Sequence, residues 1–134
     1  IEIINQDILK VDEKVISKKK LLVFGNLPYN ISTEIICNWI IKLEKDFWFT
    51  ELILMFQKEV AERIISKINT SSYGRLSILL NWKMDVKKLI DIGPNCFYPK
   101  PKIDSSLLHF IPKKNYFPIQ KSKNLEMVTR VFFI

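Results

Sequence analysis

Cysteine, histidine and glycine are scarce in this chain of 134 residues, which has two cysteines, one histidine and three glycines. Cys37 and Cys96 are too few and too isolated for a disulfide framework or a zinc site, so we expect a reducing compartment, the cytoplasm, and no bound metal. His109 stands alone, which argues against a histidine-based triad, and its place in an alternating segment predicts a strand surface residue. The chain also has no glycine-rich phosphate-binding loop.

Long hydrophobic runs are missing as well. No apolar segment approaches the roughly 18–20 residues that a membrane span needs. Residues 1–7 have neither the basic nor the apolar region of a signal peptide, so we expect no membrane partner. The composition, with 48% hydrophobic and 26% charged residues, excludes a disordered chain, and the length suits one domain or most of one.

The charge is distributed unevenly along the chain. Residues 1–50 contain seven basic and seven acidic residues, whereas residues 51–134 contain fourteen basic and seven acidic ones and so carry the whole net charge of +7. A basic second half is typical of a protein that meets a polyanion. A solvated, lysine-rich surface with no partner explains the same numbers, and the charge alone leaves both interpretations open.

Short apolar runs alternate with helical periodicity. We expect strands at residues 1–5, 21–24, 52–56, 76–80, 86–92 and 105–111. One helix is expected to begin with Ser32 as its cap, and its apolar face consists of Ile35, Ile36, Trp39, Ile40 and Leu43. A second helix is expected to bury Val60, Ala61, Ile64 and Ile65. Its Glu59 and Arg63 are an exposed i,i+4 pair. This order predicts a parallel α/β sheet with antiparallel strands at its C-terminal edge.

Polar groups follow two of these strands, where open α/β sheets bind ligands. Pro28 stiffens the turn Asn26-Leu27-Pro28-Tyr29, so that Asn26 and Tyr29 stand at its mouth. Asn26, with a backbone carbonyl of the turn, has the acceptors for an exocyclic amine, and Tyr29 offers a ring for stacking a heterocycle. An ordinary strand-to-helix turn with a buried tyrosine fits the same residues.

Asp7 follows the first strand and either accepts hydrogen bonds from a ligand's adenine or ribose or serves as a local helix cap. A second aromatic group lies in the proline-rich loop of residues 96–105, where Lys100 and Lys102 flank the aromatic and proline residues. Phe97 on such a rigid, basic loop suits base stacking with phosphate contact. Alternatively, Phe97 packs into the core at the sheet edge and the two lysines are simply exposed to solvent.

These residues resemble motifs of the ribosomal RNA adenine N6,N6-dimethyltransferases. The turn Gly25-Asn26-Leu27-Pro28-Tyr29-Asn30-Ile31-Ser32 resembles the family's motif IV. Four further blocks match in order: Gln6-Asp7, Phe56 to Arg63, Tyr73-Gly74-Arg75-Leu76-Ser77, and Phe97 to Ser106. The match spans residues 1 to about 112 and is specific because five blocks occur in the right order.

The resemblance implies a Rossmann-like, class I methyltransferase sheet that uses S-adenosylmethionine and acts on small-subunit ribosomal RNA or a pre-ribosomal particle. It implies that Asp7 contacts the cofactor's adenine, and that Asn26 lies between cofactor and target. Tyr29 and Phe97 would sandwich the flipped target adenine, with Pro28, Lys100 and Lys102 on the RNA side.

The resemblance also implies that the chain is incomplete. We expect residues 1–112 to be a partial catalytic domain without the family's glycine-rich cofactor loop, 113–124 a linker, and 125–134 the start of a helical domain. Such a chain would bind S-adenosylmethionine poorly by itself and expose a face or edge of its sheet. A non-catalytic RNA-binding remnant and another adenine-N6 methylase are the alternative functions.

Overall fold

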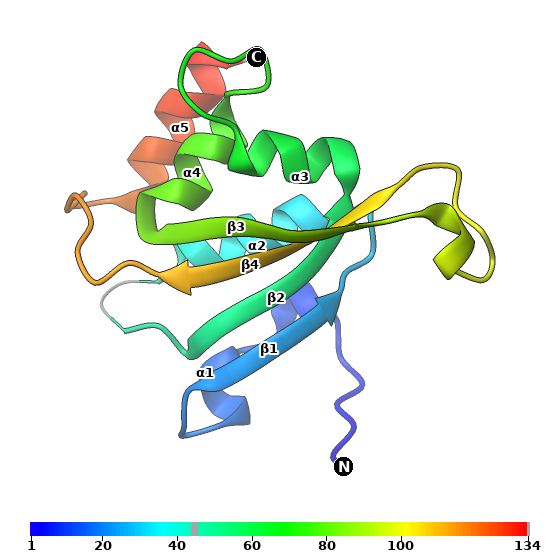
Figure 1. Cartoon of the computed structure of the whole chain (residues 1–134). Helices are drawn as coiled ribbons and strands as arrows, with labels where there is room; N and C mark the ends of the chain where they lie inside the picture. Colours follow the sequence, from blue (N-terminus) through cyan, green and yellow to red (C-terminus); the bar gives the residue numbers. More distant parts are fainter. Residues whose placement is uncertain (44–45, 134) are drawn as a thin grey trace.

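The computed structural model describes residues 1–43 and 46–133, and its centre is one four-stranded sheet (Figure 1). The strands are β1 (Leu21–Asn26), β2 (Phe49–Gln57), β3 (Met84–Ile92) and β4 (Ser105–Pro112), in the order β1-β2-β4-β3. β1 and β2 run parallel, whereas β4 pairs antiparallel with both β2 and β3. The α/β sheet with antiparallel strands toward the C-terminal side is therefore confirmed.

The helical elements are η1 (Ile8–Lys10), α1 (Glu13–Ile16), α2 (Ser32–Ile41), α3 (Lys58–Ile65), α4 (Arg75–Lys83), η2 (Pro94–Cys96) and α5 (Ser122–Phe132). One hydrophobic core joins α2, α3 and α4 to the strands. Its fully buried side chains include Ile36 and Ile40 of α2, Ile64 of α3, Phe56 of β2 and Phe110 of β4. The apolar faces predicted for α2 and α3 are thus the faces that the protein buries.

The edge strand β1 has one buried and one open side. Val23 packs against the core, whereas Leu22 and Phe24 point to the other side of the strand and are 53% and 70% exposed. Alternation along a strand produces this division. The expected exposure of one sheet face at this edge is confirmed.

Local hydrogen bonds show how α2 and α3 are formed. α2 begins at Ser32, but Ser32 is no cap: its Oγ donates to the carbonyl oxygen of Tyr29 at 3.3 Å. In α3, Arg63 and Glu59 form the predicted pair, with 2.7 Å between Nη2 and Oε1. Both predicted helices exist, and the cap assigned to the first is wrong.

Two predicted strands are wrong. Residues 1–5 are exposed and pair with no strand that the structure describes, although a strand needs a partner for its backbone groups. Residues 76–80 belong to helix α4, which buries Ser77, Leu79 and Leu80. Short apolar runs do not separate a buried strand from a buried helix, and that ambiguity caused the second error.

The segment at residues 113–121, between β4 and α5, is tied to α4. The backbone N–H of Lys113 donates to the carbonyl of Lys83 at 2.9 Å, and Trp82 Nε1 donates to the carbonyl of Phe117 at 2.7 Å. α5 begins at Ser122 and ends at Phe132, so the helix predicted over residues 125–134 is confirmed for residues 125–132 and begins three residues earlier than expected. Ile134 lies outside the described residues.

Candidate functional site

Four of the predicted site residues line one open pocket beyond the carboxyl end of β1. The pocket has a volume of about 350 Å³ and is lined by Asn26, Leu27, Pro28, Tyr29, Phe97, Tyr98, Pro99 and Pro101. Pockets for small ligands span about 300–1,000 Å³, so this one is at the small end of the range. The fold thus brings together Asn26, Pro28 and Tyr29 from one motif and Phe97 from the other.

The turn after β1 presents Asn26 and anchors itself through Leu27. Asn26 is the last residue of β1 and is exposed, whereas Leu27 is buried in the core. The carbonyl of Pro28 accepts a hydrogen bond from the N–H of Ile31 at 3.2 Å, which closes the bend. The side-chain amide of Asn26 therefore stands on a fixed turn, where its oxygen is available as an acceptor.

Tyr29 forms one wall of the pocket and is held at both ends. Its carbonyl accepts from Ser32, as described above, and its phenol oxygen lies 2.6 Å from Ser105 Oγ in a hydrogen bond. The ring is half-buried. A tyrosine so placed has a defined ring orientation and a polar end that is already satisfied.

Phe97 lines the pocket from the loop between β3 and β4. Its N–H donates to the carbonyl of Pro94 at 3.2 Å at the end of η2, and its side chain is half-buried. Tyr98 is fully exposed and precedes Pro99 through a cis peptide bond. Sequence reasoning missed Tyr98 as a lining residue, although its position beside Phe97 in a run of aromatic and proline residues was a usable signal.

Lys100 and Lys102 are exposed on the same loop and do not line the pocket. The loop ends in an anchor, because the N–H of Lys58 at the start of α3 donates to the carbonyl of Asp104 at 3.0 Å. The two lysines therefore flank the pocket on a loop that is fixed at its end.

Asp7 is not among the residues that line this pocket. Its Oδ1 accepts from the N–H of Leu9 at 3.0 Å and so caps η1, and its Oδ2 lies 4.0 Å from Lys10 Nζ. The structure gives Asp7 the local capping role that the sequence left open. The carboxylate is exposed and keeps lone pairs for a further donor.

His109 is half-buried rather than a freely exposed strand residue. Its Nε2 lies 2.5 Å from Oε2 of Glu51 on the adjacent strand β2. Among the residues that the structure describes, no group of three His, Cys, Asp or Glu side chains is placed to hold a metal ion. In the same part of the chain, no helix is both long and apolar enough to cross a membrane.

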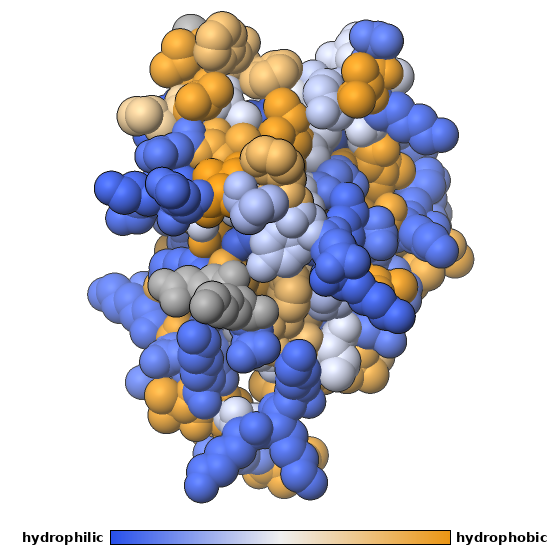
Figure 2. Space-filling view, turned by 90° about the vertical axis from the view of Figure 1, so that its left-hand side faces the viewer, coloured by the Kyte–Doolittle hydropathy of each residue, from blue (hydrophilic) through white to orange (hydrophobic). Residues whose placement is uncertain are grey.

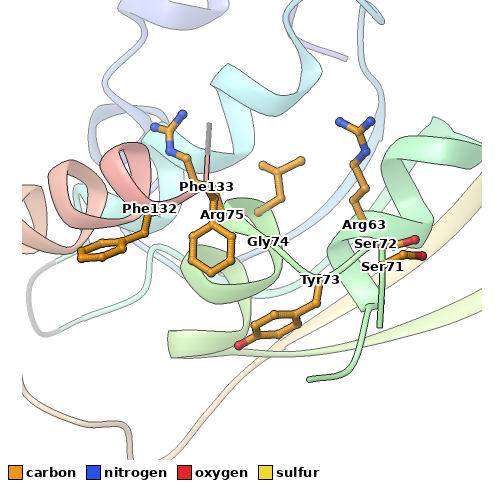
Figure 3. A pocket seen from close by; sticks show the side chains of 9 residues that line it. Arg63, Ser71, Ser72, Tyr73, Gly74, Arg75, Phe132 and Phe133 are labelled. Carbon is orange, nitrogen blue, oxygen red and sulfur yellow. The ribbon is translucent and has the colours of Figure 1, made fainter. Parts of the chain in front are cut away.

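A second hollow lies at the loop before α4, where the block Tyr73–Ser77 begins (Figure 3). It measures about 490 Å³ and is lined by Arg63, Ser71, Ser72, Tyr73, Gly74, Arg75, Leu76, Phe132 and Phe133. Both arginines have partners: Arg63 pairs with Glu59, and Arg75 Nη2 lies 2.8 Å from Glu126 Oε1. None of the site residues predicted from the sequence lies here.

Cys37 is electrostatically linked to this region. Burial raises the pKa of its thiol to about 11; the Arg75 guanidinium lowers the pKa and the Glu126 carboxylate raises it by lesser amounts. The thiol is therefore protonated at neutral pH, and a buried protonated thiol is a poor nucleophile. Cys37 is therefore no candidate nucleophile. The candidate site is the pocket beside β1, because residues of two of the predicted motifs meet there.

The family model for ribosomal RNA adenine dimethylases matches residues 1–134, the whole chain. This chain belongs to the ribosomal RNA adenine dimethylase family. It is 64% identical over 133 residues to a protein of Pelagibacter ubique named ribosomal RNA small subunit methyltransferase A, covering 99% of this chain and 51% of that protein. A protein of the same name from Xanthobacter autotrophicus is 40% identical, with 99% and 46% covered. The chain thus spans about half the length of these curated relatives.

Solved structures of related proteins share the fold. A dimethyladenosine transferase from Plasmodium falciparum superposes with a TM-score of 0.64 at 35% identity, covering 69% of this chain and 33% of the other. The 23S rRNA methyltransferase ErmE superposes with a TM-score of 0.65 at 20% identity, covering 96% of this chain and 48% of the other. The sheet of this chain is therefore part of the Rossmann-like methyltransferase fold.

Proposed function

We propose that the chain is the adenine-binding part of an S-adenosylmethionine-dependent enzyme that dimethylates N6 of adenosines in small-subunit ribosomal RNA. The observation that carries the proposal is the pocket in which Asn26, Tyr29 and Phe97 meet. Membership of the family and the names of the relatives support the substrate class. Ribosome biogenesis, in the cytoplasm, is the process in which we place the reaction.

The residues of the pocket match the chemistry of an adenine amine. The lone pair of this amine is delocalised into the purine ring, so it is a weak nucleophile. The side-chain oxygen of Asn26 would accept one amine hydrogen and a backbone carbonyl of the turn at Pro28 the other, which helps the lone pair localise on nitrogen. Tyr29 and Phe97 would hold the base by its faces, and stacking of this kind contributes about 1–3 kcal/mol per base.

Positioning would supply most of the acceleration, since no protein nucleophile is needed. Bound S-adenosylmethionine would supply an electrophilic sulfonium methyl group. Asp7 and Asn26 are the residues we assign to it: the exposed carboxylate of Asp7 has lone pairs free for the cofactor's adenine amine. Orientation of two reactants is worth up to about 7–11 kcal/mol in well-aligned systems. Extruding the target base costs a few kcal/mol, which the two rings would offset.

The test is methyl transfer by a chimera in which this chain replaces the matching segment of the Pelagibacter relative. Undermethylated small ribosomal subunits serve as substrate, with large-subunit RNA and adenine-containing DNA as comparisons. We expect methylation of the small subunit alone. Asn26→Ala should lower kcat by about a hundredfold or more, as loss of a group that stabilises a transition state does.

Asn30→Ala is the matched control, because Asn30 is an exposed asparagine of the same turn that does not line the pocket. It should keep nearly full activity. Activity that survives Asn26→Ala would contradict the role of Asn26, and methylation of DNA in preference to the small subunit would favour another adenine-N6 methylase. The excess of basic residues in the second half also suits a non-catalytic RNA-binding protein; RNA binding without methyl transfer by the chimera would favour that function.

A further inference from the structure

We propose that Ser105 is a positioning residue for the adenine pocket: its hydroxyl fixes the Tyr29 ring and so sets the gap between Tyr29 and Phe97. The inference rests on the proposed function, because it names the residue that holds the base-binding rings in place. No sequence motif assigned Ser105 a role. The contact that reveals it joins residues 76 positions apart in the chain.

The hydroxyl contact is short and its anchor is rigid. The oxygens of Tyr29 and Ser105 lie 2.6 Å apart. Ser105 is completely buried and is the first residue of β4, where it pairs with Gln57 of β2 on one side and Ile92 of β3 on the other. A strand residue paired on both sides has little freedom, so it can fix a ring that lies on a turn at the sheet edge.

Ser105 also follows directly on the loop that carries Phe97. The loop that carries Phe97 ends at Asp104, whose carbonyl accepts from the N–H of Lys58, and Ser105 follows directly. The side chain of Ser105 therefore binds the turn of Tyr29, while its backbone continues the loop of Phe97. The turn of Tyr29 and the end of the Phe97 loop therefore meet at the start of β4.

The neighbouring serine shows that this contact is specific. Ser106 is equally buried, but its Oγ donates to Asp91 Oδ1 at 2.6 Å and has no contact with Tyr29. Successive residues of a strand point to opposite faces, which explains the two different partners. Ser106 is therefore a matched control: it loses a buried hydroxyl from the same strand without touching the pocket.

The experiment compares Ser105→Ala, Ser106→Ala, Tyr29→Phe and the double variant Ser105→Ala with Tyr29→Phe in the chimera described above. Loss of one hydrogen bond of this kind changes an equilibrium by about three- to tenfold. We expect Ser105→Ala and Tyr29→Phe each to lower kcat by about that factor and leave KM for S-adenosylmethionine unchanged. The double variant should be no slower than either single one, and Ser105→Thr should restore the rate. Ser106→Ala should keep the rate.

A spectroscopic readout separates this inference from the proposed function. In the chain itself, with ring-labelled tyrosine, the NMR signals of Tyr29 are identified by their loss in Tyr29→Phe. Ser105→Ala should shift these signals and speed the ring flip, and Ser106→Ala should do neither. This result is expected whether or not the chimera transfers methyl groups.

Three outcomes would overturn the inference: an unchanged Tyr29 signal in Ser105→Ala, additive losses in the double variant, or equal losses of rate in Ser105→Ala and Ser106→Ala. An inactive chimera in which Ser105→Ala still frees the Tyr29 ring would instead overturn the proposed function and leave the positioning contact established.

Discussion

Among single residues, Gly25 determines how closely the turn after β1 lies on the sheet. A Cβ at this position would lie 2.7 Å from Cδ2 of Leu54 and 3.2 Å from Cδ2 of Leu27. The requirement is space rather than a special backbone conformation. Because Leu54 is fully buried and Leu27 anchors the turn that presents Asn26, a larger residue here must displace part of the core next to the pocket.

Gly25→Ala should therefore lower the free energy of unfolding by about 1–3 kcal/mol, the usual cost of overpacking a core. Urea unfolding of the chain measures it. Gly93→Ala is the control, since nothing lies within 4 Å of a Cβ at that position, and it should change stability by less than about 0.5 kcal/mol. Equal effects of the two substitutions would show that the contact with Leu54 is not limiting.

At this scale the sequence predicted several of the residues that line the pocket but not their hydrogen-bond partners. The pattern Asn-Leu-Pro-Tyr identified Asn26 and Tyr29 because a proline-stiffened turn after a strand is a local feature. It could not identify Ser105 as the partner of Tyr29, because that contact depends on how β4 lies beside β2. For Asp7 the sequence left the role itself open, because a short polar residue after an apolar run can cap a helix or contact a ligand equally well.

Among the secondary-structure elements, α4 ends in a buried lysine that binds the end of α2. Lys83 Nζ donates to the carbonyls of Leu43 at 2.5 Å and Ile40 at 3.4 Å, and it lies 4.2 Å from the centroid of the Trp82 ring. The last carbonyls of a helix lack partners within the helix, and a cation there is favourable. Burial lowers the pKa of Lys83 below its usual value of 10.5.

Lys83→Met, which keeps the apolar stem, should lower the free energy of unfolding at pH 7 by about 1–3 kcal/mol, because the carbonyl of Leu43 loses its donor. The carbonyl of Ile40 keeps the N–H of Leu43 at 3.4 Å. The native state releases the Lys83 proton at a lower pH than the unfolded chain does, so the unfolded state binds more protons in the alkaline range below 10.5. The stability of the natural chain should therefore rise with pH relative to the variant in that range. Unfolding curves at several pH values measure both effects; a variant as stable as the natural chain, or a difference independent of pH, would contradict them.

Helices were predictable from the sequence where the apolar positions repeat with helical spacing over several turns. α2 and α3 have apolar positions three and four residues apart over two or more turns, and both were found. Residues 76–80 were predicted wrongly because this short apolar run is broken only by Ser77. The helical spacing of Leu76, Leu79 and Leu80 covers the same five residues, so the run does not separate a helix from a strand. Tertiary packing against α3 decided the outcome, through Ser77 Oγ donating to the carbonyl of Arg63.

The whole molecule is a sheet covered by helices on one side, with a basic surface. Figure 2 shows the end of the molecule that carries α5: hydrophilic side chains cover much of this face, and apolar ones gather at the top. Exposed apolar residues of α5 include Met127, Val131 and Phe132. The sequence predicted the class of fold, but it could not predict which apolar side chains stay exposed, because burial depends on which elements meet.

The salt dependence of RNA affinity can distinguish phosphate contacts made by particular lysines from a general effect of the net positive charge. Lys100→Gln with Lys102→Gln should reduce the slope of log affinity against log salt by about 1.4 for a single-stranded RNA that contains adenosine, since each of the two phosphate contacts contributes about 0.7. Lys18→Gln with Lys19→Gln, exposed lysines before β1, removes the same charge and should leave the slope nearly unchanged. Fluorescence anisotropy at several salt concentrations measures both. Equal changes in the two double variants would favour a merely solvated lysine surface.

The ties between the segment at residues 113–121 and α4 have a mechanical consequence. The N–H of Lys113 donates to the carbonyl of Lys83, and the side chain of Lys83 donates to the carbonyl of Leu43 just after α2. α2 begins three residues after Tyr29. These hydrogen bonds connect the start of the segment before α5, through α4 and α2, to the turn that carries Asn26. A displacement of that segment would therefore reach the mouth of the pocket through the helices, by a route separate from the strand pairing.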